Sequence, residues 1–290
     1  MSTREAARER ARIVDAEFEA LKREVFKSTS LDCRQYKEPY LKRRFNVRMR
    51  SVGAETYSDY MRHLRTHKEE LGLLMDDLTI NVTQFFRDPI VFKALEEQML
   101  PLIIYRHICQ GTTNIRIWSA GCSSGEEPYS VAILLKELLG EQLDDFHITI
   151  LATDIDDSCL ADAQAANYLP RQLVCMPQAY RERYFSPRAE YLSLDSEIVG
   201  MVTFKKHDLF TGVPAKALDM ILCRNVVIYF ARRMQETLYM GFFEALREGG
   251  YFVMGNTETM IGPASSAFDQ VLARERVYQK PVSSTVPSAR

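Results

Sequence analysis

The segment best suited to chemistry is residues 119–130, SAGCSSGEEPYS. It follows an apolar run that predicts a buried strand and precedes an apolar stretch that predicts a helix. Its glycines, Gly121 among them, let the backbone approach a ligand, and the N–H groups of a new helix point at that ligand. The spacing matches neither GxGxxG nor GxxxxGK[ST], and Glu126 and Glu127 place negative charge where a phosphate would bind. We therefore expect a cationic or zwitterionic ligand, and S-adenosylmethionine carries both a sulfonium and an amino-acid end.

Acidic residues follow two further strand-like runs. Asp154 ends the apolar run 148–153, and the acid at the tip of the second strand of a nucleotide-binding fold accepts hydrogen bonds from a ribose diol. Asp156 is expected to cap the next helix, although a capping role for both acids stays open. Asp208, with Leu209 beside it, could accept from an adenine amino group, or the pair could belong to a simple turn.

Two more polar groups lie where a ligand could bind. Asn225 follows the predicted strand 217–223, at the sheet edge where ligands bind in such folds, and Tyr229 lies just beyond it. In residues 79–88, polar and apolar side chains alternate, which predicts an extended segment with one polar edge facing a cleft. Its alternative is an ordinary linker in which Arg87 pairs with an acid.

These residues need elements that bring them together. Residues 5–78 show helical periodicity only, with Val14, Phe18, Leu21 and Val25 on one face, and residues 88–107 predict one further helix. From residue 113, strands at 115–119, 148–153, 217–223 and 251–255 alternate with helices at 125–139, 157–165 and 231–247, which predicts a parallel, doubly wound sheet. Short strands at 191–194 and 202–204 predict a small antiparallel insertion, and residues 271–280 predict closing antiparallel strands.

We therefore expect a helical domain over residues 1–78, a linker and leading helix over 79–112, and an α/β domain over 113–280. The β insertion is expected at about 170–206, and residues 281–290 are expected to be a disordered tail.

Composition narrows the functional class. A net charge of −2 on 290 residues argues against a general nucleic-acid binder. No apolar stretch approaches the roughly 18 residues of a membrane span, and the charged N-terminus lacks the apolar core of a secretory signal. The six cysteines form no CxxC pair, which is typical of reduced thiols and indicates no metal site, and Cys122 is expected to fill its loop. We expect a cytoplasmic, monomeric protein without membrane insertion.

Four blocks together resemble the CheR family of chemotaxis receptor methyltransferases. They are NVTQFFRD at 81–88, SSGEEPYS at 123–130, ATDID at 152–156 and CRNVVIYF at 223–230. The resemblance covers nearly the whole chain. It implies a class I, Rossmann-like methyltransferase with an all-α N-terminal domain, which transfers a methyl group from S-adenosylmethionine to glutamate carboxylates of chemoreceptors and releases S-adenosylhomocysteine.

The resemblance also implies site residues. Arg87 and Tyr229 would lie near the transferred methyl group. The residues lining the cofactor would be Asn81, Thr83, Arg87, Glu127, Asp154, Asp208, Leu209, Asn225 and Val226. Asp208 stands where relatives often carry Asn, and its carboxylate can still accept from an adenine amino group. The insertion has no Gly-rich turn, which resembles the members that act without a C-terminal receptor tether.

A basic helix supplies a candidate substrate surface. Residues 34–50 carry seven basic side chains and one acid, and Arg43, Arg44, Arg48 and Arg50 are our candidate contacts to glutamate-rich receptor helices. A merely solvated charged face is the alternative. Two other functions stay open: a cofactor-binding sensor or adaptor without turnover, and a methyltransferase acting on RNA or a small molecule.

Overall fold

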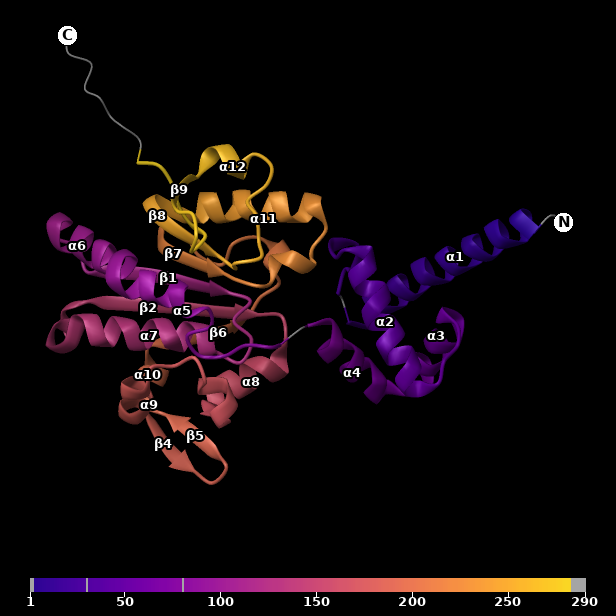
Figure 1. Ribbon diagram of the computed structural model, residues 1–290, viewed down its shortest axis with the longest axis horizontal. Helices are drawn as coiled ribbons and strands as arrows, with labels where there is room; N and C mark the ends of the chain where they lie inside the picture. Colours follow the sequence, from indigo (N-terminus) through magenta and orange to yellow (C-terminus); the bar gives the residue numbers. More distant parts are fainter. Residues whose placement is uncertain (1–2, 30, 80, 283–290) are drawn as a thin grey trace, which may run out of the picture. The chain divides into compact units, whose positions relative to one another are not determined.

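The computed structural model describes residues 3–29, 31–79 and 81–282, and it divides into two compact units (Figure 1). The described residues of the helical unit fall within Met1–Ile80 and Tyr229–Met234, and those of the sheet unit fall within Asn81–Ile228 and Gln235–Arg290. Within the described part of the chain, no helix is long and apolar enough to cross a membrane. Of the tail predicted over 281–290, residues 283–290 lie outside the described residues.

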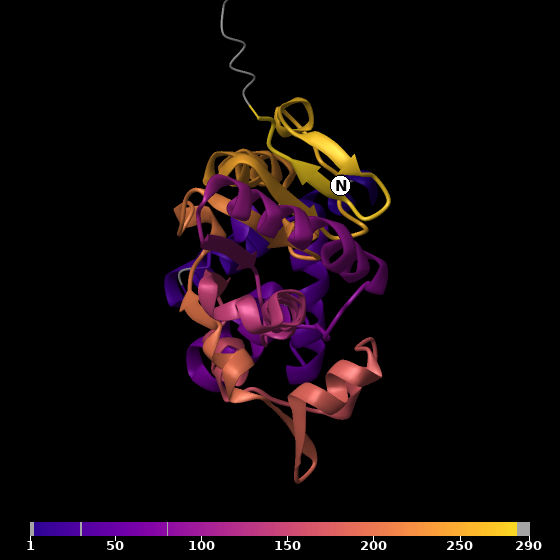
Figure 2. The ribbon, with the colours of Figure 1, turned by 90° about the vertical axis from the view of Figure 1, so that its left-hand side faces the viewer.

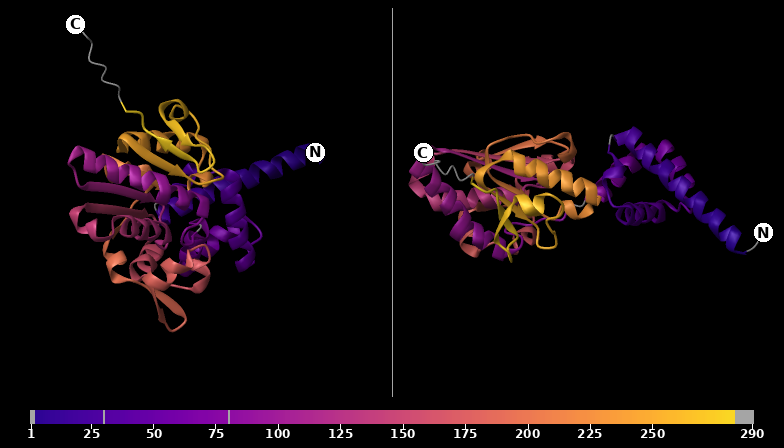
Figure 3. Two further views of the ribbon diagram at one scale, coloured as in Figure 1. Left: turned by 60° about the vertical axis from the view of Figure 1, so that its left-hand side comes forward. Right: turned by 90° about the horizontal axis from the view of Figure 1, so that it is seen from above.

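The helical unit contains α1 (Thr3–Thr29), α2 (Glu38–Val52), α3 (Tyr57–Thr66) and α4 (Lys68–Leu78). Phe18, Leu21 and Val25 of α1 are buried as predicted, but Val14 is 42% exposed. The reason is visible in Figure 3, where the first turns of α1 extend beyond the other helices of this unit. Gly53, at φ +70°, ends α2 in a left-handed conformation that suits glycine.

The sheet unit is built on seven strands in the order β6-β2-β1-β7-β8-β10-β9. Strands β6, β2, β1, β7 and β8 run parallel, whereas β10 and β9 are antiparallel. Their bounds are β1 Asn114–Ala120, β2 His147–Asp154, β6 Val202–Lys206, β7 Leu218–Cys223, β8 Leu246–Met254, β9 Asp269–Leu272 and β10 Val277–Gln279. The helices are α5 Pro89–Ala94, α6 Leu100–Gln110, α7 Glu126–Leu139, α8 Asp157–Ala165, α9 Gln178–Tyr184, α10 Ser196–Gly200, α11 Arg232–Ala245 and α12 Ala264–Ala267.

Both faces of the sheet are covered because its strands are apolar on both sides. In β1, Ile117 joins the core cluster that includes α7, whereas the next residue, Trp118, packs on Phe242 of α11 with ring centroids 5.4 Å apart. Phe242 in turn packs on Phe252 of β8, at 5.1 Å. Helices on both faces of a mainly parallel sheet form the predicted doubly wound fold.

One predicted helix is interrupted. Residues 88–107 were expected to form a single helix, but a π-helical segment, Leu95–Met99, lies between α5 and α6. Pro101 explains the interruption, because its ring has no N–H and clashes with the carbonyl four residues earlier in an ordinary α-helix.

The insertion is smaller than predicted. Its sheet has the order β3-β5-β4, from Asn167–Tyr168, Tyr191–Leu194 and Phe185–Arg188. The prediction that residues 202–204 belong to it was wrong, because β6 pairs in parallel with β2, and Val202 is buried there. The β4–β5 hairpin and the closing β9–β10 hairpin lie at opposite ends of the sheet unit (Figure 2). The latter pair confirms the prediction for residues 271–280.

Candidate active site

The tips of three parallel strands meet at the carboxyl edge of the sheet. Gly121, directly after β1, donates its N–H to the carbonyl of Thr153 in β2 at 2.8 Å. It has φ +78°, and a Cβ on it would lie 2.6 Å from a methyl carbon of Val226, which follows β7. Glycine is therefore required here both by the left-handed backbone and by the close approach of the neighbouring loop. Three of the predicted blocks adjoin at this edge.

Two acids fix the tip of β2. Asp154 accepts hydrogen bonds from the N–H groups of Ser123, at 2.8 Å, and Asp156, at 3.1 Å. Burial raises the pKa of the Asp154 carboxyl, and the backbone N–H groups oppose that shift. Asp156 caps α8 by accepting from the N–H groups of Ser158 and Cys159, which confirms its predicted capping role. It also accepts from the side-chain amide of Asn81 at 2.8 Å, so Asn81 is held at the same edge.

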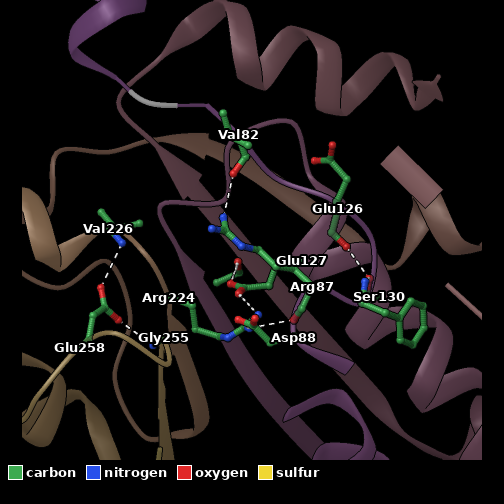
Figure 4. A network of polar contacts seen from close by, with 12 residues as sticks. Val82, Arg87, Asp88, Glu126, Glu127, Ser130, Arg224, Val226, Gly255 and Glu258 are labelled. Atoms are coloured by element: carbon green, nitrogen blue, oxygen red, sulfur yellow. Dashed lines mark hydrogen bonds and ion pairs between the residues drawn. The ribbon is translucent and has the colours of Figure 1, made fainter. Parts of the chain in front are cut away.

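A buried arginine connects the first turn of α7 with the segment before α5. Arg224, whose side chain is 2% exposed, donates to Glu127 at 3.2 Å and to Asp88 at 2.7 Å (Figure 4). It also donates to the Arg87 carbonyl at 2.8 Å. Glu127 accepts a further bond from the hydroxyl of Ser119 at 2.8 Å. We call Arg224, Glu127 and Asp88 the Arg224 cluster. No role was predicted for Arg224 or Asp88 from the sequence.

The segment that carries Arg87 is a turn at its end and not an extended strand. Phe86 and Asp88 have φ +53° and +62°, so the extended conformation predicted for residues 79–88 is wrong at this end of the segment. Arg87 donates to the Val82 carbonyl at 2.8 Å, as Figure 4 shows. Thr83 is half-buried in the same segment. The turn thus brings the Arg87 guanidinium back to the backbone of the same segment, at Val82.

The tip of β7 is held by a residue that sequence reasoning missed. Glu258 accepts from the N–H groups of Val226, at 3.1 Å, Val227, at 3.0 Å, and Gly255, at 2.6 Å. Asn225, at φ +62°, adopts a left-handed conformation, and its side-chain oxygen Oδ1 is buried without a hydrogen-bond partner. A buried acceptor without a partner has an unmet need for a donor.

Two other predicted features have local roles. Asp208 begins the 3-10 turn Leu209–Thr211 and accepts from the N–H of Phe210 at 2.9 Å, so the simple turn that we left open is present. Its contact with an adenine, and that of Leu209, stay predictions. Cys122 is buried, and this burial raises the pKa of its thiol well above the usual value, as expected for a loop filler.

Glu126 and Glu127 have different surroundings although they are adjacent. Glu126 is fully buried and accepts from the Ser124 hydroxyl and from Gln172 at 2.6 Å. Burial raises the pKa of the Glu126 carboxyl. Glu126 therefore ties α7 to the start of the insertion, and Glu127 is the acid of this pair that belongs to the Arg224 cluster.

Tyr229, which was predicted to lie near the transferred methyl group, belongs to the helical unit. The carbonyl of Tyr229 accepts from the N–H of Lys37 at 2.9 Å, and its ring packs on Tyr40 with centroids 4.8 Å apart. Tyr40 donates to the Leu78 carbonyl at 2.6 Å, and burial raises the pKa of its hydroxyl to about 12. Tyr229 thus lies on a ring that is itself fixed.

The four arginines proposed as substrate contacts differ in their surroundings. Arg43 and Arg50 are exposed, and Arg44 lies over the ring of Tyr40, its guanidinium carbon 5.7 Å from the ring centroid. Arg48 forms two hydrogen bonds, of 2.9 and 2.6 Å, with the buried carboxylate of Glu70. The structure thus gives Arg48 a role inside the helical unit and leaves Arg43 and Arg50 on its surface.

These residues fit S-adenosylmethionine in kind. Asp154 offers carboxylate oxygens for a ribose diol, Glu127 carries charge for an ammonium group, and the unpartnered Oδ1 of Asn225 needs a donor. Gly121 itself adds no side chain at the tip of β1, where the methyl groups of Val226 already lie. Among the described residues, no group of three or more His, Cys, Asp or Glu is placed to hold a metal ion.

Comparison with known proteins identifies the family. The family described as "CheR methyltransferase, SAM binding domain" matches residues 81–277, and "CheR methyltransferase, all-alpha domain" matches residues 16–79. A chemotaxis protein methyltransferase of Listeria monocytogenes is 34% identical over 245 residues, covering 83% of this chain and 89% of that protein. A protein of that name from Borreliella burgdorferi is 32% identical over 243 residues, covering 82% and 86%. Chemotaxis protein methyltransferase 2 of Vibrio cholerae is 31% identical over 276 residues, covering 93% and 94%.

These matches confirm the resemblance and the expected fold, an α/β methyltransferase domain with a small antiparallel insertion and an all-α N-terminal region. They span the four blocks from which the resemblance was inferred. The chain belongs to the CheR methyltransferase family, and its sheet unit carries that family's S-adenosylmethionine-binding domain.

Proposed function

We propose that this protein is a protein-glutamate O-methyltransferase that modifies chemoreceptors. The observation that carries the proposal is the polar carboxyl edge of the sheet, which carries Gly121, Asp154 and Asn225, with the acid Glu127 in the first turn of α7. The names of its relatives support a role in chemotaxis. Its products would be glutamyl methyl esters and S-adenosylhomocysteine.

Methyl transfer to a glutamate carboxylate requires no general base from the protein. A glutamate side chain has a reference pKa of about 4.3, so the acceptor is already ionised at neutral pH and needs no general base. When bound, S-adenosylmethionine supplies an electrophilic methyl group on a sulfonium. Asp154 and Asn225 would hold the nucleoside, Glu127 the amino-acid end, and Asn81, Thr83, Asp208, Leu209 and Val226 would line the site.

Two residues would act on the acceptor. The Arg87 guanidinium would orient the incoming carboxylate, and Tyr229 would support that geometry from the ring on which it packs. Positioning of this kind can supply roughly 7–11 kcal/mol of the barrier. Arg87 must not bind the carboxylate more tightly in the ground state than in the transition state, since only the difference raises the rate.

The receptor would engage the basic face of α2. Exposed Arg43 and Arg50 complement glutamate-rich methylation helices, with Arg44 beside them. The turn of the β4–β5 hairpin contains Ala189, at φ +54°, and no glycine, which supports engagement without a receptor tether. We also infer a monomer that works in the cytoplasm and needs no metal.

The test is transfer of radiolabelled methyl groups. Wild-type protein, S-adenosylmethionine tritiated in the methyl group and membranes that contain the organism's own receptors should give label that is released by mild base, as an ester is. Arg87→Ala should lose most transfer while the unfolding curve stays unchanged. Base-stable label would reject a carboxyl acceptor, and tight cofactor binding without any transfer would indicate an adaptor instead of an enzyme.

A further inference from the structure

A buried acid links the two loops that follow β7 and β8. Glu258 is 2% exposed, and one of its carboxylate oxygens accepts from Val226 and Val227 while the other accepts from Gly255. Figure 4 shows the carboxylate between the two loops. Because one side chain satisfies N–H groups from both loops, neither loop can move without breaking bonds to it.

This carboxylate is neutralised differently from Glu127. Glu127 faces the guanidinium of Arg224, whereas no Lys, Arg or His of the described chain forms an ion pair with Glu258. Burial raises the pKa of Glu258, and the backbone N–H bonds oppose that shift. Three backbone N–H donors stabilise the ionised form of this carboxylate, and the field of such a buried charge is weakly screened inside a protein.

The hydrogen bonds to Glu258 hold a backbone conformation that non-glycine residues rarely adopt. Asn225 is held at φ +62°, in the left-handed region. A Cβ on Gly255 would lie 2.7 Å from the Asn225 nitrogen and 2.9 Å from the Glu258 Oε2, so the two loops touch where the acid binds. The unpartnered Oδ1 of Asn225 therefore has its place set by the bonds to Glu258.

We propose that Glu258 is a positioning residue of the cofactor site, which fixes the Asn225–Val226 turn and adds a buried negative charge that favours a sulfonium over a neutral thioether. The proposal rests on the proposed assignment of Asn225 and Val226 to the cofactor. S-adenosylmethionine and S-adenosylhomocysteine share their ammonium, carboxylate and nucleoside groups, so the ratio of their affinities isolates the charge on sulfur.

The test is calorimetric titration of both nucleosides into wild-type protein and Glu258→Gln. The variant keeps the shape of the side chain but loses its charge and turns an N–H donor towards a backbone donor. We expect weaker binding of both nucleosides, with a loss about tenfold larger for S-adenosylmethionine, as for one unit charge removed from a partly buried site. Equal losses overturn the charge contribution, and unchanged affinities overturn the whole proposal.

Two further variants separate the effect of the charge from a general loss of stability. Glu258→Asp keeps the charge on a shorter stem, so it should weaken both nucleosides while it retains the wild-type affinity ratio, even if Glu258→Gln does not fold. Asp219→Asn is the control for loss of a buried carboxylate outside the site. Asp219 is equally buried but lies at the start of β7, where it accepts from the N–H of Arg116 at 2.9 Å and also contacts His107 at 2.9 Å and Arg247 at 3.1 Å. This substitution should lower stability and leave both affinities unchanged. Wild-type protein that binds neither nucleoside would refute the proposed function itself, which is a different result.

Discussion

Replacing Arg224 by methionine tests whether the Arg224 cluster holds the active-site segment in place. Methionine keeps much of the apolar stem that packs near Phe92, whose ring centroid lies 5.4 Å from the guanidinium carbon. It removes the charge that Glu127 and Asp88 share, and the donor to the Arg87 carbonyl. The change thus leaves the protein's acids at the site without their cation.

The expected loss of stability follows from burial. The side chain of Arg224 is 2% exposed and that of Glu127 is 12% exposed, so water screens the pair poorly. Removing one partner of such a buried pair costs about 3–5 kcal/mol, because the remaining charge is left uncompensated. Arg224→Met combined with Glu127→Gln and Asp88→Asn should recover most of that loss, since no buried charge then lacks a partner.

The assay is urea unfolding followed by circular dichroism. Arg65→Met is the control, since Arg65 also forms two hydrogen bonds to one carboxylate, of 2.8 and 2.9 Å to Glu24, but on the surface. It should lose far less stability, because water solvates the Glu24 carboxylate that remains. A loss below about 1 kcal/mol for Arg224→Met, or no recovery in the triple variant, would refute the account of a buried pair.

Three further predictions concern other parts of the molecule. Gly121→Ala should cost about 1–3 kcal/mol in urea unfolding and weaken S-adenosylmethionine in calorimetry, because φ is +78° and the new Cβ meets a valine; wild-type affinity would show that the loop yields. Burial raises the pKa of Glu70, but bonds from Arg48 and Tyr60 outweigh this and lower it below its usual 4.5. The stability advantage of wild type over Glu70→Gln should therefore be complete above about pH 4.5 and shrink as the pH falls through the lowered value, and an advantage that grows in acid would contradict this. Arg43→Glu with Arg50→Glu should reduce methyl transfer at low receptor concentration and leave cofactor affinity unchanged; an equal loss of both would reject the separation of the two surfaces.

The parallel sheet and its polar edge were predictable because they depend on local pattern. An apolar run that ends in a polar residue predicts both a strand and its tip, and Asp154 and Asn225 were found in this way. The turn at Gly121 followed from glycine's conformational freedom. Asp156 was assigned as a cap from its position alone, and the structure confirms it.

The residues that hold the edge together were not predictable by the same means. Glu258 lies in the loop after β8, more than thirty residues from the valines whose N–H groups it binds. Arg224 lies in the CRNVVIYF block, in which Asn225, Val226 and Tyr229 were predicted as site residues. Its partner Asp88 is 136 positions earlier, so the pattern of the block does not reveal the pair. Polar residues in loops have no periodicity that reveals their partners. The same limit applies to Arg48, which sequence alone grouped with the surface arginines and which is bound to buried Glu70.

The acidic side chains at this edge of the sheet have opposite effects on the two substrates. An edge that contains the acids Glu127, Asp154 and Glu258 attracts a cationic cofactor, but the same field repels an acidic acceptor. Arg224 cannot relieve that repulsion, because it is buried and bound to Glu127 and Asp88. Arg87 precedes Asp88 in the chain, and its side chain is only half-buried. Its guanidinium, which donates to the Val82 carbonyl, can therefore offer positive charge to the acceptor. We therefore expect that charge, and not a general base, limits transfer: Arg87→Lys should keep part of the activity that Arg87→Ala loses, and the rate of either should vary little with pH above the pKa of the acceptor glutamate.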